Sequence, residues 1–189
     1  MTIRYWKAED DVVALTEMLH RAYAPLAARG LRYSATHQTP EVTLRRLTDG
    51  HALVAEIDGR IVGTVTYYRP DPESDTPVYR DSVTFSFGQF GVDPEFKGRG
   101  IGRALHSAMI AAVVDSGAKY IALDTAAPAA DLIALYERWG YVVVGCARWK
   151  ATNYESVIMR REVILMPNQS PDPALASITH PAGQGARHR

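Results

Sequence analysis

Apolar and polar positions along this chain show two patterns, one typical of strands and one typical of helices, and together they predict a mixed α/β fold. Runs rich in β-branched and aromatic residues favour strands, whereas apolar residues at helical spacing favour helices. The strands predicted in this way are 3–6, 52–57, 61–68, 83–92, 120–123, 141–149 and 154–160. The first predicted helix is capped by Asp10 or Asp11 and ends before an irregular segment at 25–39. Further helices are predicted at 40–47, 100–117 and 128–139, and the proline-rich segment 69–81 is expected to be a loop.

Local signals add detail to this order of elements. Asp58-Gly59 between two strand-like runs predicts a tight β-hairpin. The segments 83–92, 100–117 and 120–123 form one βαβ unit. We expect a single domain over 1–165, followed at 166–189 by a disordered tail of residues that have little to bury. Cys146 lies in an apolar run and is expected to be buried.

Glycines gather where strand 83–92 gives way to helix 100–117, in the order Lys97-Gly98-Arg99-Gly100-Ile101-Gly102. The first backbone N–H groups of a helix have no intrahelical partner, and with the positive end of the helix dipole they favour a phosphate. Glycine lets such a ligand approach the backbone closely. Lys97, Arg99 and Arg103 add positive charge at the same place. The sequence therefore predicts an anion cradle for a phosphorylated cofactor.

Two other phosphate-binding motifs fit these glycines poorly. A Walker A loop requires a lysine followed by serine or threonine, and the chain contains no such pair. The dinucleotide fingerprint G-x-G-x-x-G meets Arg103 where its third glycine belongs. Asp124 follows at roughly the spacing of a ribose-binding acid, so an NAD-type dinucleotide-binding enzyme is kept as an unfavoured alternative.

Gly100 and Gly102, preceded by Val92-Asp93-Pro94-Glu95-Phe96, resemble motif A of the GNAT N-acetyltransferase superfamily, whose pattern is Q/R-x-x-G-x-G/A at a helix start. Lys97 stands at the Q/R position. The resemblance implies a mixed, mostly antiparallel twisted sheet of about seven strands, flanked by about four helices, with a central βαβ cofactor unit. It also implies acetyl-CoA as the acyl donor. The residues that would bind it are Phe90, Gly91, Val92, Lys97, Gly98, Arg99, Gly100, Ile101, Gly102, Arg103 and Ala104.

A second stretch, Leu135-Tyr136-Glu137-Arg138-Trp139-Gly140-Tyr141, resembles the L-Y-x-x-x-G-F/Y signature of GNAT motif B. The resemblance implies that the Tyr136 hydroxyl lies beside the cofactor sulfur and acts as the catalytic general acid. A phenol with a pKa of about 10 can protonate a departing thiolate of somewhat lower pKa. Read without the resemblance, Tyr136 belongs to an apolar helical stripe that is typical of core packing. A backbone N–H near Val92 is expected to stabilise the oxyanion.

The general base is left open. Acetyl transfer to an amine needs a neutral nitrogen, and strand 83–92 contains no carboxylate. The candidates are a water held by Gln89, or the side chains of Asp124, Glu155 and His37. An α-amine, with a pKa of about 8, would need little help from any of them.

Composition bears on which partners the protein binds and on where in the cell it is found. Lysine plus arginine and aspartate plus glutamate both number 21, so the net charge gives no support for nucleic-acid or membrane binding. One cysteine, no signal-like N-terminus and no membrane-length apolar run favour a cytoplasmic protein. The histidines lack metal-ligating spacing, so no metal is expected.

The function predicted from these features is transfer of an acetyl group from acetyl-CoA directly to a primary amine. The acceptor would be a small molecule or a peptide or protein N-terminus. A homodimer is compatible with the sequence. The main alternative is a non-catalytic acyl-CoA sensor on the same fold.

Overall fold

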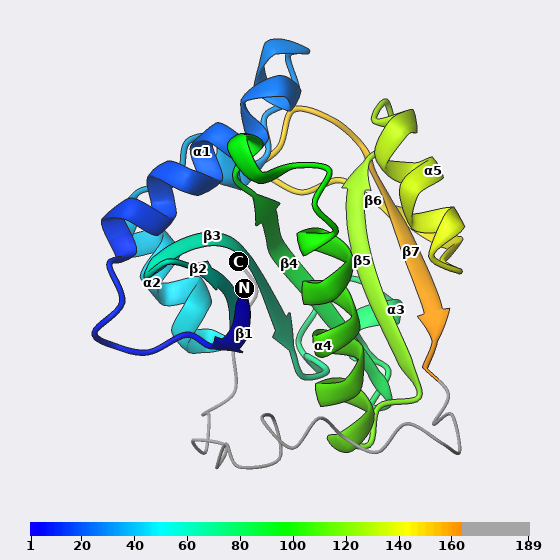
Figure 1. Cartoon of the computed structure of the whole chain (residues 1–189). Coiled ribbons are helices and arrows are strands. Elements are labelled where there is room, and N and C mark those ends of the chain that lie inside the picture. The colour runs from blue at the N-terminus through cyan, green and yellow to red at the C-terminus, as the bar shows by residue number, and fades with distance from the viewer. Residues whose placement is uncertain (164–189) are drawn as a thin grey trace.

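The structure is a computed structural model that describes residues 1–163, which form a seven-stranded sheet with the strand order β1-β2-β3-β4-β5-β7-β6 (Figure 1). All neighbouring strands run antiparallel except β4 and β5, which are parallel. The strands are β1 (Thr2–Tyr5), β2 (His51–Ile57), β3 (Arg60–Tyr68), β4 (Thr84–Val92), β5 (Tyr120–Ala126), β6 (Val142–Ala147) and β7 (Ser156–Glu162). The mixed, mostly antiparallel sheet expected from the sequence is confirmed. The predicted tail at 166–189 lies outside the described residues.

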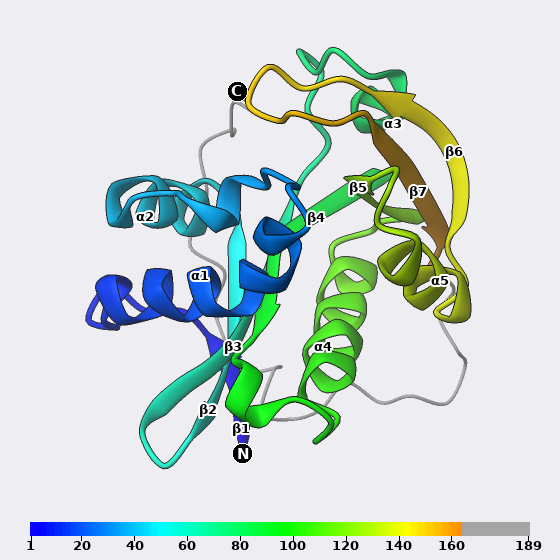
Figure 2. The same ribbon diagram turned by 90° about the horizontal axis from the view of Figure 1, so that it is seen from above.

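Helices cover both faces of the sheet, with α1 and α2 on one side and α4 and α5 on the other (Figure 2). They are α1 (Val12–Ala28), α2 (Pro40–Asp49), α3 (Pro77–Arg80), α4 (Ile101–Asp115) and α5 (Ala130–Arg138), with 3-10 turns at Ser34–Thr36 and Pro94–Phe96. A Cβ on Gly91 would lie 3.2 Å from Leu19 of α1, and one on Gly63 would lie 3.0 Å from Leu105 of α4. Glycine at these two positions lets the helices pack directly on the central strands.

The locally encoded elements form as the sequence predicts. Asp11 caps α1 by accepting the N–H of Ala14 at 3.0 Å. Asp58 and Gly59 both adopt positive φ, 51° and 77°, as the predicted two-residue hairpin turn requires. The β4-α4-β5 segment forms the predicted βαβ unit, with its two strands parallel.

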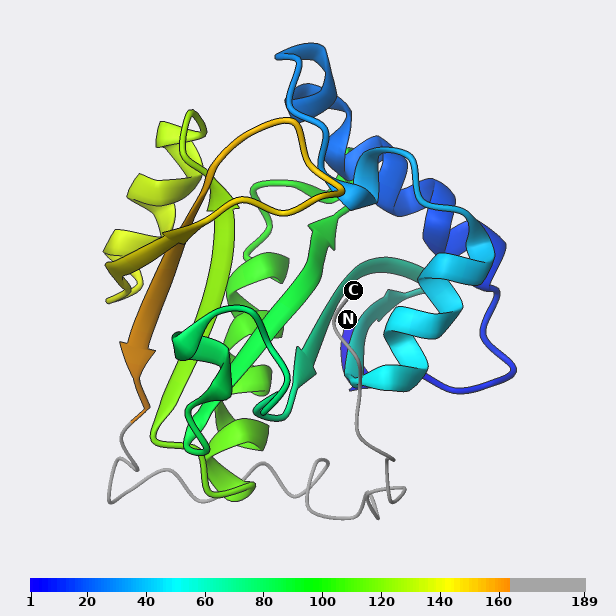
Figure 3. The same ribbon diagram turned by 180° about the vertical axis from the view of Figure 1, so that it is seen from behind.

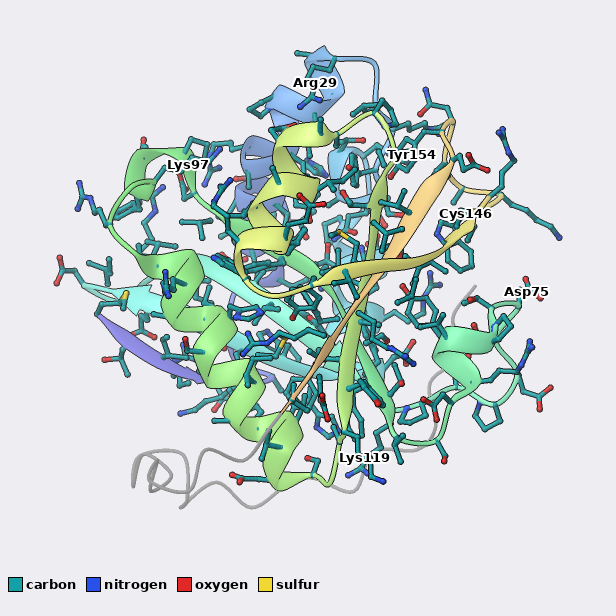
Figure 4. All side chains as sticks on the ribbon, turned by 90° about the vertical axis from the view of Figure 1, so that its right-hand side faces the viewer. Arg29, Asp75, Lys97, Lys119, Cys146 and Tyr154 are labelled. Carbon is teal, nitrogen blue, oxygen red and sulfur yellow. The ribbon has the colours of Figure 1, made fainter. Side chains whose placement is uncertain are left out.

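Three expectations are wrong. Helix α1 continues through Pro25 to Ala28. Proline costs one helical hydrogen bond there, but the last turn buries Leu26 in a cluster with Leu31, Ala126, Ala129 and Tyr154. The segment 69–81 contains the short helix α3 in addition to loop. Cys146 is exposed (Figure 4), because β6 is one of the two edge strands of the sheet. Val142 to Val144 of the same strand are exposed as well. An apolar run alone does not distinguish an edge strand from a buried one.

Within residues 1–163, none of the helices combines the length and the apolar character needed to span a bilayer.

Candidate active site

Strands β4 and β5 separate from one another part-way along their length. They pair at only three positions, Thr84 with Tyr120, Phe85 with Ile121 and Ser86 with Ala122, and beyond these the two strands diverge (Figure 1). The divergence coincides with a bulge in β4. Thr64 pairs with Gly91 and Thr66 with Gly88, so Gln89 and Phe90 together stand opposite the single residue Val65. Gln89 has a φ of 48°, and a bulge of this kind bends the strand away from its neighbour.

The bend leaves backbone groups of β4 facing the opening. Asp93 donates its N–H to the Val62 carbonyl on the β3 side at 2.8 Å. Backbone groups point alternately to the two sides of a strand, so those of Val92 and Phe90 point toward the side that β5 has left. Unpaired N–H groups on such an edge can pair with an amide of a ligand or stabilise an oxyanion.

Two tyrosines satisfy polar backbone groups on the two walls of the opening. Tyr23 of α1 donates its hydroxyl to the Phe90 carbonyl at 3.0 Å. Tyr33 accepts the N–H of Ala126 of β5 at 3.0 Å and lies 2.9 Å from the Thr125 hydroxyl. Their rings lie 5.6 Å apart. The tyrosines therefore stabilise both strands in the separated arrangement, without a third strand between them.

The loop 97–100, called the glycine loop below, lies at the wide end of this opening. Gly98 and Gly100 both have a φ of 77°, and a Cβ on either would meet no atom within 4 Å. Gly100 is the N-cap residue of α4, and the first helical bond runs from Ala104 N to Gly100 O at 3.0 Å. The N–H groups of Ile101, Gly102 and Arg103 consequently have no intrahelical partner. This arrangement fits a pyrophosphate, as the sequence predicted.

A buried carboxylate fixes the chain between β4 and the glycine loop. Asp93 is fully buried, and it accepts hydrogen bonds from Arg21 at 2.7 Å, from Arg60 at 2.8 Å and from the Glu95 N–H at 3.2 Å. Burial alone would raise the pKa of Asp93, but these arginines and the N–H lower it below its usual value. The ionised Asp93 therefore ties the loop to α1 and β3.

The opening is continuous with a large cleft of about 2650 Å³. Nearly all of the predicted cofactor residues line it, namely Phe90, Gly91, Val92, Lys97, Gly98, Gly100, Ile101, Gly102 and Arg103. Lys97 lies on the loop that leads into α4 (Figure 4). Arg99 and Ala104 do not line the cleft, and the Arg99 guanidinium instead stacks 5.1 Å from the centre of the Phe96 ring.

Tyr136 of α5 reaches the same cleft from the β5 side. Its ring packs against Phe87 at 6.1 Å and Tyr141 at 5.8 Å between ring centres. Its hydroxyl forms no hydrogen bond within residues 1–163, where Trp6 Nε1 is the one fully buried side-chain polar atom that lacks a partner. The Tyr136 hydroxyl is therefore open to the cleft. Burial, followed by the nearby hydroxyls of Tyr23 and Tyr141, raises its pKa well above 10, so the phenol stays protonated at neutral pH.

The far half of the cleft is enclosed by three loops. They are the α1–α2 connection, the segment that leads to α3 and the β6–β7 loop, which crosses toward the end of α1 (Figure 3). Asn153 links two of them, since its side chain donates to Gly30 O at 2.8 Å and accepts the Arg32 N–H at 2.9 Å. An acceptor would enter here, on the face opposite α4.

The four candidate bases have different surroundings. Asp124 of β5 lines the cleft and accepts hydrogen bonds from Trp149 at 2.8 Å, Ser156 at 3.0 Å and Tyr79 at 3.2 Å. The Gln89 amide is buried and bonded to Gln38 and Thr66. His37 is exposed at the cleft rim, whereas Glu155 is exposed and does not line the cleft. Among residues 1–163, no group of three or more histidine, cysteine, aspartate or glutamate side chains could hold a metal ion.

Comparison with known proteins agrees with this geometry. Residues 13–141 match the Acetyltransferase (GNAT) family. The chain belongs to the GNAT family. It is 32% identical over 139 residues to the S-(2-succino)cysteine N-acetyltransferase of Bacillus subtilis (strain 168), covering 72% of this chain and 82% of that protein. It is 26% identical over 137 residues to the S-alkylcysteine N-acetyltransferase of the same organism, covering 71% and 75%.

Solved GNAT structures share the fold. One is a GNAT family acetyltransferase from Elizabethkingia anophelis with acetyl-CoA bound, at a TM-score of 0.60 and 17% identity, covering 85% of this chain and 97% of that one. This GNAT protein is therefore an N-acetyltransferase that uses acetyl-CoA, as the sequence predicted. The NAD-type alternative is wrong, because the chain belongs to the GNAT family and its seven-stranded sheet has one parallel strand pair.

Three residues that line this cleft were not singled out by the sequence, namely Tyr23, Tyr33 and Arg46. Tyr23 and Tyr33 lie outside every motif, and what places them at the site is their contact with distant strands, Tyr23 with Phe90 and Tyr33 with Ala126. Arg46 lies in the predicted helix 40–47, where a charged residue normally indicates a solvated face.

Proposed function

We propose that the acceptor is the α-amine of an S-substituted cysteine, and that Tyr136 and the open edge of β4 carry out the transfer. Support for the acceptor comes from the two Bacillus subtilis relatives, whose names specify S-(2-succino)cysteine and S-alkylcysteine. Support from the site comes from Arg46, Arg69 and Arg148, which line the cleft and can each bind a carboxylate of the acceptor; carboxylates such as Asp71 and Glu73 line it too.

Acetyl-CoA, the acyl donor, would run from the start of α4 along the open edge of β4. With its pyrophosphate on the N–H groups of Ile101 to Arg103, the pantetheine arm would pass Val92 first and Phe90 second. Val92 then pairs with an amide of the arm, and the Phe90 N–H faces the thioester carbonyl. Lys97 and Arg103 line the phosphate end of this path.

The chemistry is a direct transfer. The neutral amine attacks the thioester carbon, and the carbonyl electrons move onto oxygen, where the open-edge N–H of β4 stabilises the negative charge. Collapse of the tetrahedral intermediate forms the amide and breaks the C–S bond. Tyr136 donates its proton to the departing thiolate and is reprotonated from solvent. The products are the N-acetyl amino acid and CoA.

Asp124 is the carboxylate among the candidates that lines the acceptor side of the cleft. Within residues 1–163 its Oδ1 accepts one hydrogen bond, from Tyr79 at 3.2 Å, and a carboxylate oxygen has a second lone pair that could attract the substrate ammonium and receive its proton. An α-amine has a pKa of about 8, so this modest assistance suffices near neutral pH. The observation that carries the transfer step is the combination, in one opening, of the free β4 edge with a Tyr136 hydroxyl that has no hydrogen-bond partner among residues 1–163. Homodimer formation stays a prediction.

The full chain should be mixed with acetyl-CoA and S-(2-succino)cysteine, and the release of free CoA thiol measured alongside product mass. N-acetylated S-(2-succino)cysteine is the matched control, because its amine is blocked. We expect CoA release with the free amine and none with the blocked one. Preference for a peptide with a free N-terminus would contradict the small-molecule acceptor. Binding of acetyl-CoA without CoA release to any amine would favour the sensor alternative.

A further inference from the structure

Arg46 of α2 brings a positive charge into the acceptor side of the cleft without a counter-ion. The residue is half-buried and lines the cleft. Within residues 1–163 its guanidinium forms no ion pair, since every salt bridge found there involves a different arginine. Its Nη1 donates to the neutral Gln38 Oε1 at 2.8 Å. Because partly buried charges are normally paired, an unpaired guanidinium facing a substrate cleft indicates an anionic ligand.

Two buried amides hold this guanidinium in place. Arginine can only donate, so Gln38 must present its oxygen to Arg46 and its nitrogen to other partners. The Gln38 nitrogen donates to Gln89 Oε1 at 2.8 Å and to the Thr43 hydroxyl at 2.7 Å. Both glutamines are buried. Gln89 is the bulge residue, so the orientation of Arg46 is fixed by the same feature that separates β4 from β5.

Gly88 leaves the space that the guanidinium occupies. A Cβ on Gly88 would lie 3.1 Å from Arg46 Nη2. Gly88 is two residues before Phe90, which is roughly 6–7 Å along a strand. On β5, Asp124 lies two residues beyond Ala122, just as Gly88 lies two beyond its partner Ser86 on β4. A cation and a carboxylate therefore flank the start of the opening, close to the open-edge N–H groups.

We propose that Arg46 binds the α-carboxylate of the acceptor while the α-amine lies between Phe90 and Asp124. This inference rests on the proposed function. A guanidinium–carboxylate contact of about 2.8 Å, together with the bonds that separate an α-carboxylate from its amine, spans the distance from Gly88 to Phe90. The site then selects free amino acids over peptide N-termini, whose first residue has no carboxylate. Arg46 determines this specificity without entering the acetyl transfer.

The test compares S-methylcysteine, whose one carboxylate is the α-carboxylate, with its carboxamide. The ratio of kcat/KM for acid over amide is measured for the wild type, Arg46→Gln and Arg46→Lys. Arg45→Gln is the control, since Arg45 is exposed, lines the same cleft and forms no bond to Gln38, so its removal takes the same charge from the cleft without touching the held guanidinium. We expect the wild type and Arg45→Gln to prefer the acid by roughly 10- to 100-fold, and Arg46→Gln to lose this preference while keeping its activity on the amide. Arg46→Lys should recover part of it.

Acetyl-CoA affinity, measured by titration calorimetry, reports whether each variant is folded. An unchanged acid preference in Arg46→Gln would overturn the role of Arg46 but would leave the proposed acceptor class standing. Equal losses on the acid and the amide would also overturn it, because they would indicate a structural role. If the wild type binds acetyl-CoA but acetylates neither compound nor S-(2-succino)cysteine, the acceptor class of the proposed function is wrong, and the role of Arg46 falls with it.

Discussion

Substituting Tyr136 and Tyr141, two tyrosines of one aromatic cluster, should separate an effect on kcat from an effect on the free energy of unfolding. The Tyr136 hydroxyl opens to the cleft and forms no hydrogen bond within residues 1–163, so Tyr136→Phe removes no protein contact and fills the same space. The free energy of unfolding should change by no more than about 0.5 kcal/mol. If this hydroxyl protonates the thiolate, kcat should fall by roughly 10²-fold or more, because general acids contribute on that scale. The dissociation constant of acetyl-CoA should stay near its wild-type value.

Tyr141→Phe is the matched control. The Tyr141 hydroxyl lies 2.8 Å from His106 Nε2, and both side chains are buried. Removing it leaves the imidazole nitrogen unpaired, which should lower the free energy of unfolding by about 1–3 kcal/mol. Tyr141 does not line the cleft, so kcat should be retained. Urea unfolding followed by tryptophan fluorescence, with CoA-release kinetics, measures both effects. A Tyr136→Phe variant with wild-type kcat would refute the general-acid role, and equal kinetic losses in both variants would point to general disturbance of the cluster.

The parts of this GNAT protein that could be predicted are those that local conformation determines. The Gly100 φ of 77° and the free N–H groups of α4 follow from glycine at a helix start. The Asp58-Gly59 turn is likewise a property of two residues. Tyr136 could be recognised because it has a fixed place in a family signature. In each case the informative residues are close together in the sequence.

The missed features depend on contacts between distant residues. The bulge at Gln89 is visible only in the register of β4 against β3, and Gln89 itself reads as an ordinary polar strand position. The role of Arg46 depends on Gln38, which lies in the loop before α2, and on Gly88, which lies in β4. Cys146 was misjudged because strand order, which places β6 at the edge, is not encoded in the strand itself. The acceptor half of the cleft is built from such contacts, so the sequence predicts the donor side better.

Two further predictions concern the cradle and the pH dependence of stability. Gly100→Glu combined with Gly102→Glu should abolish acetyl-CoA binding in calorimetry. Gly117→Glu controls for the strain of a positive φ, because Gly117 has a φ of 85° and a Cβ there would meet no atom within 4 Å. Retained affinity in the double variant would contradict the anion cradle. His106 packs against Trp139, and its burial, followed by the charges of Arg161 and Arg103, lowers its pKa from 6.5 to about 4. The unfolded chain then takes up a proton as pH falls below 6.5, whereas the folded chain does so only near 4, so the stabilising contribution is present above pH 6.5 and is lost between the two values. The free energy of unfolding should fall by roughly 3 kcal/mol across this window, and His106→Gln should reduce that slope because glutamine does not titrate. Urea unfolding at several pH values measures it, and identical slopes in the wild type and the variant would show that other groups cause the loss.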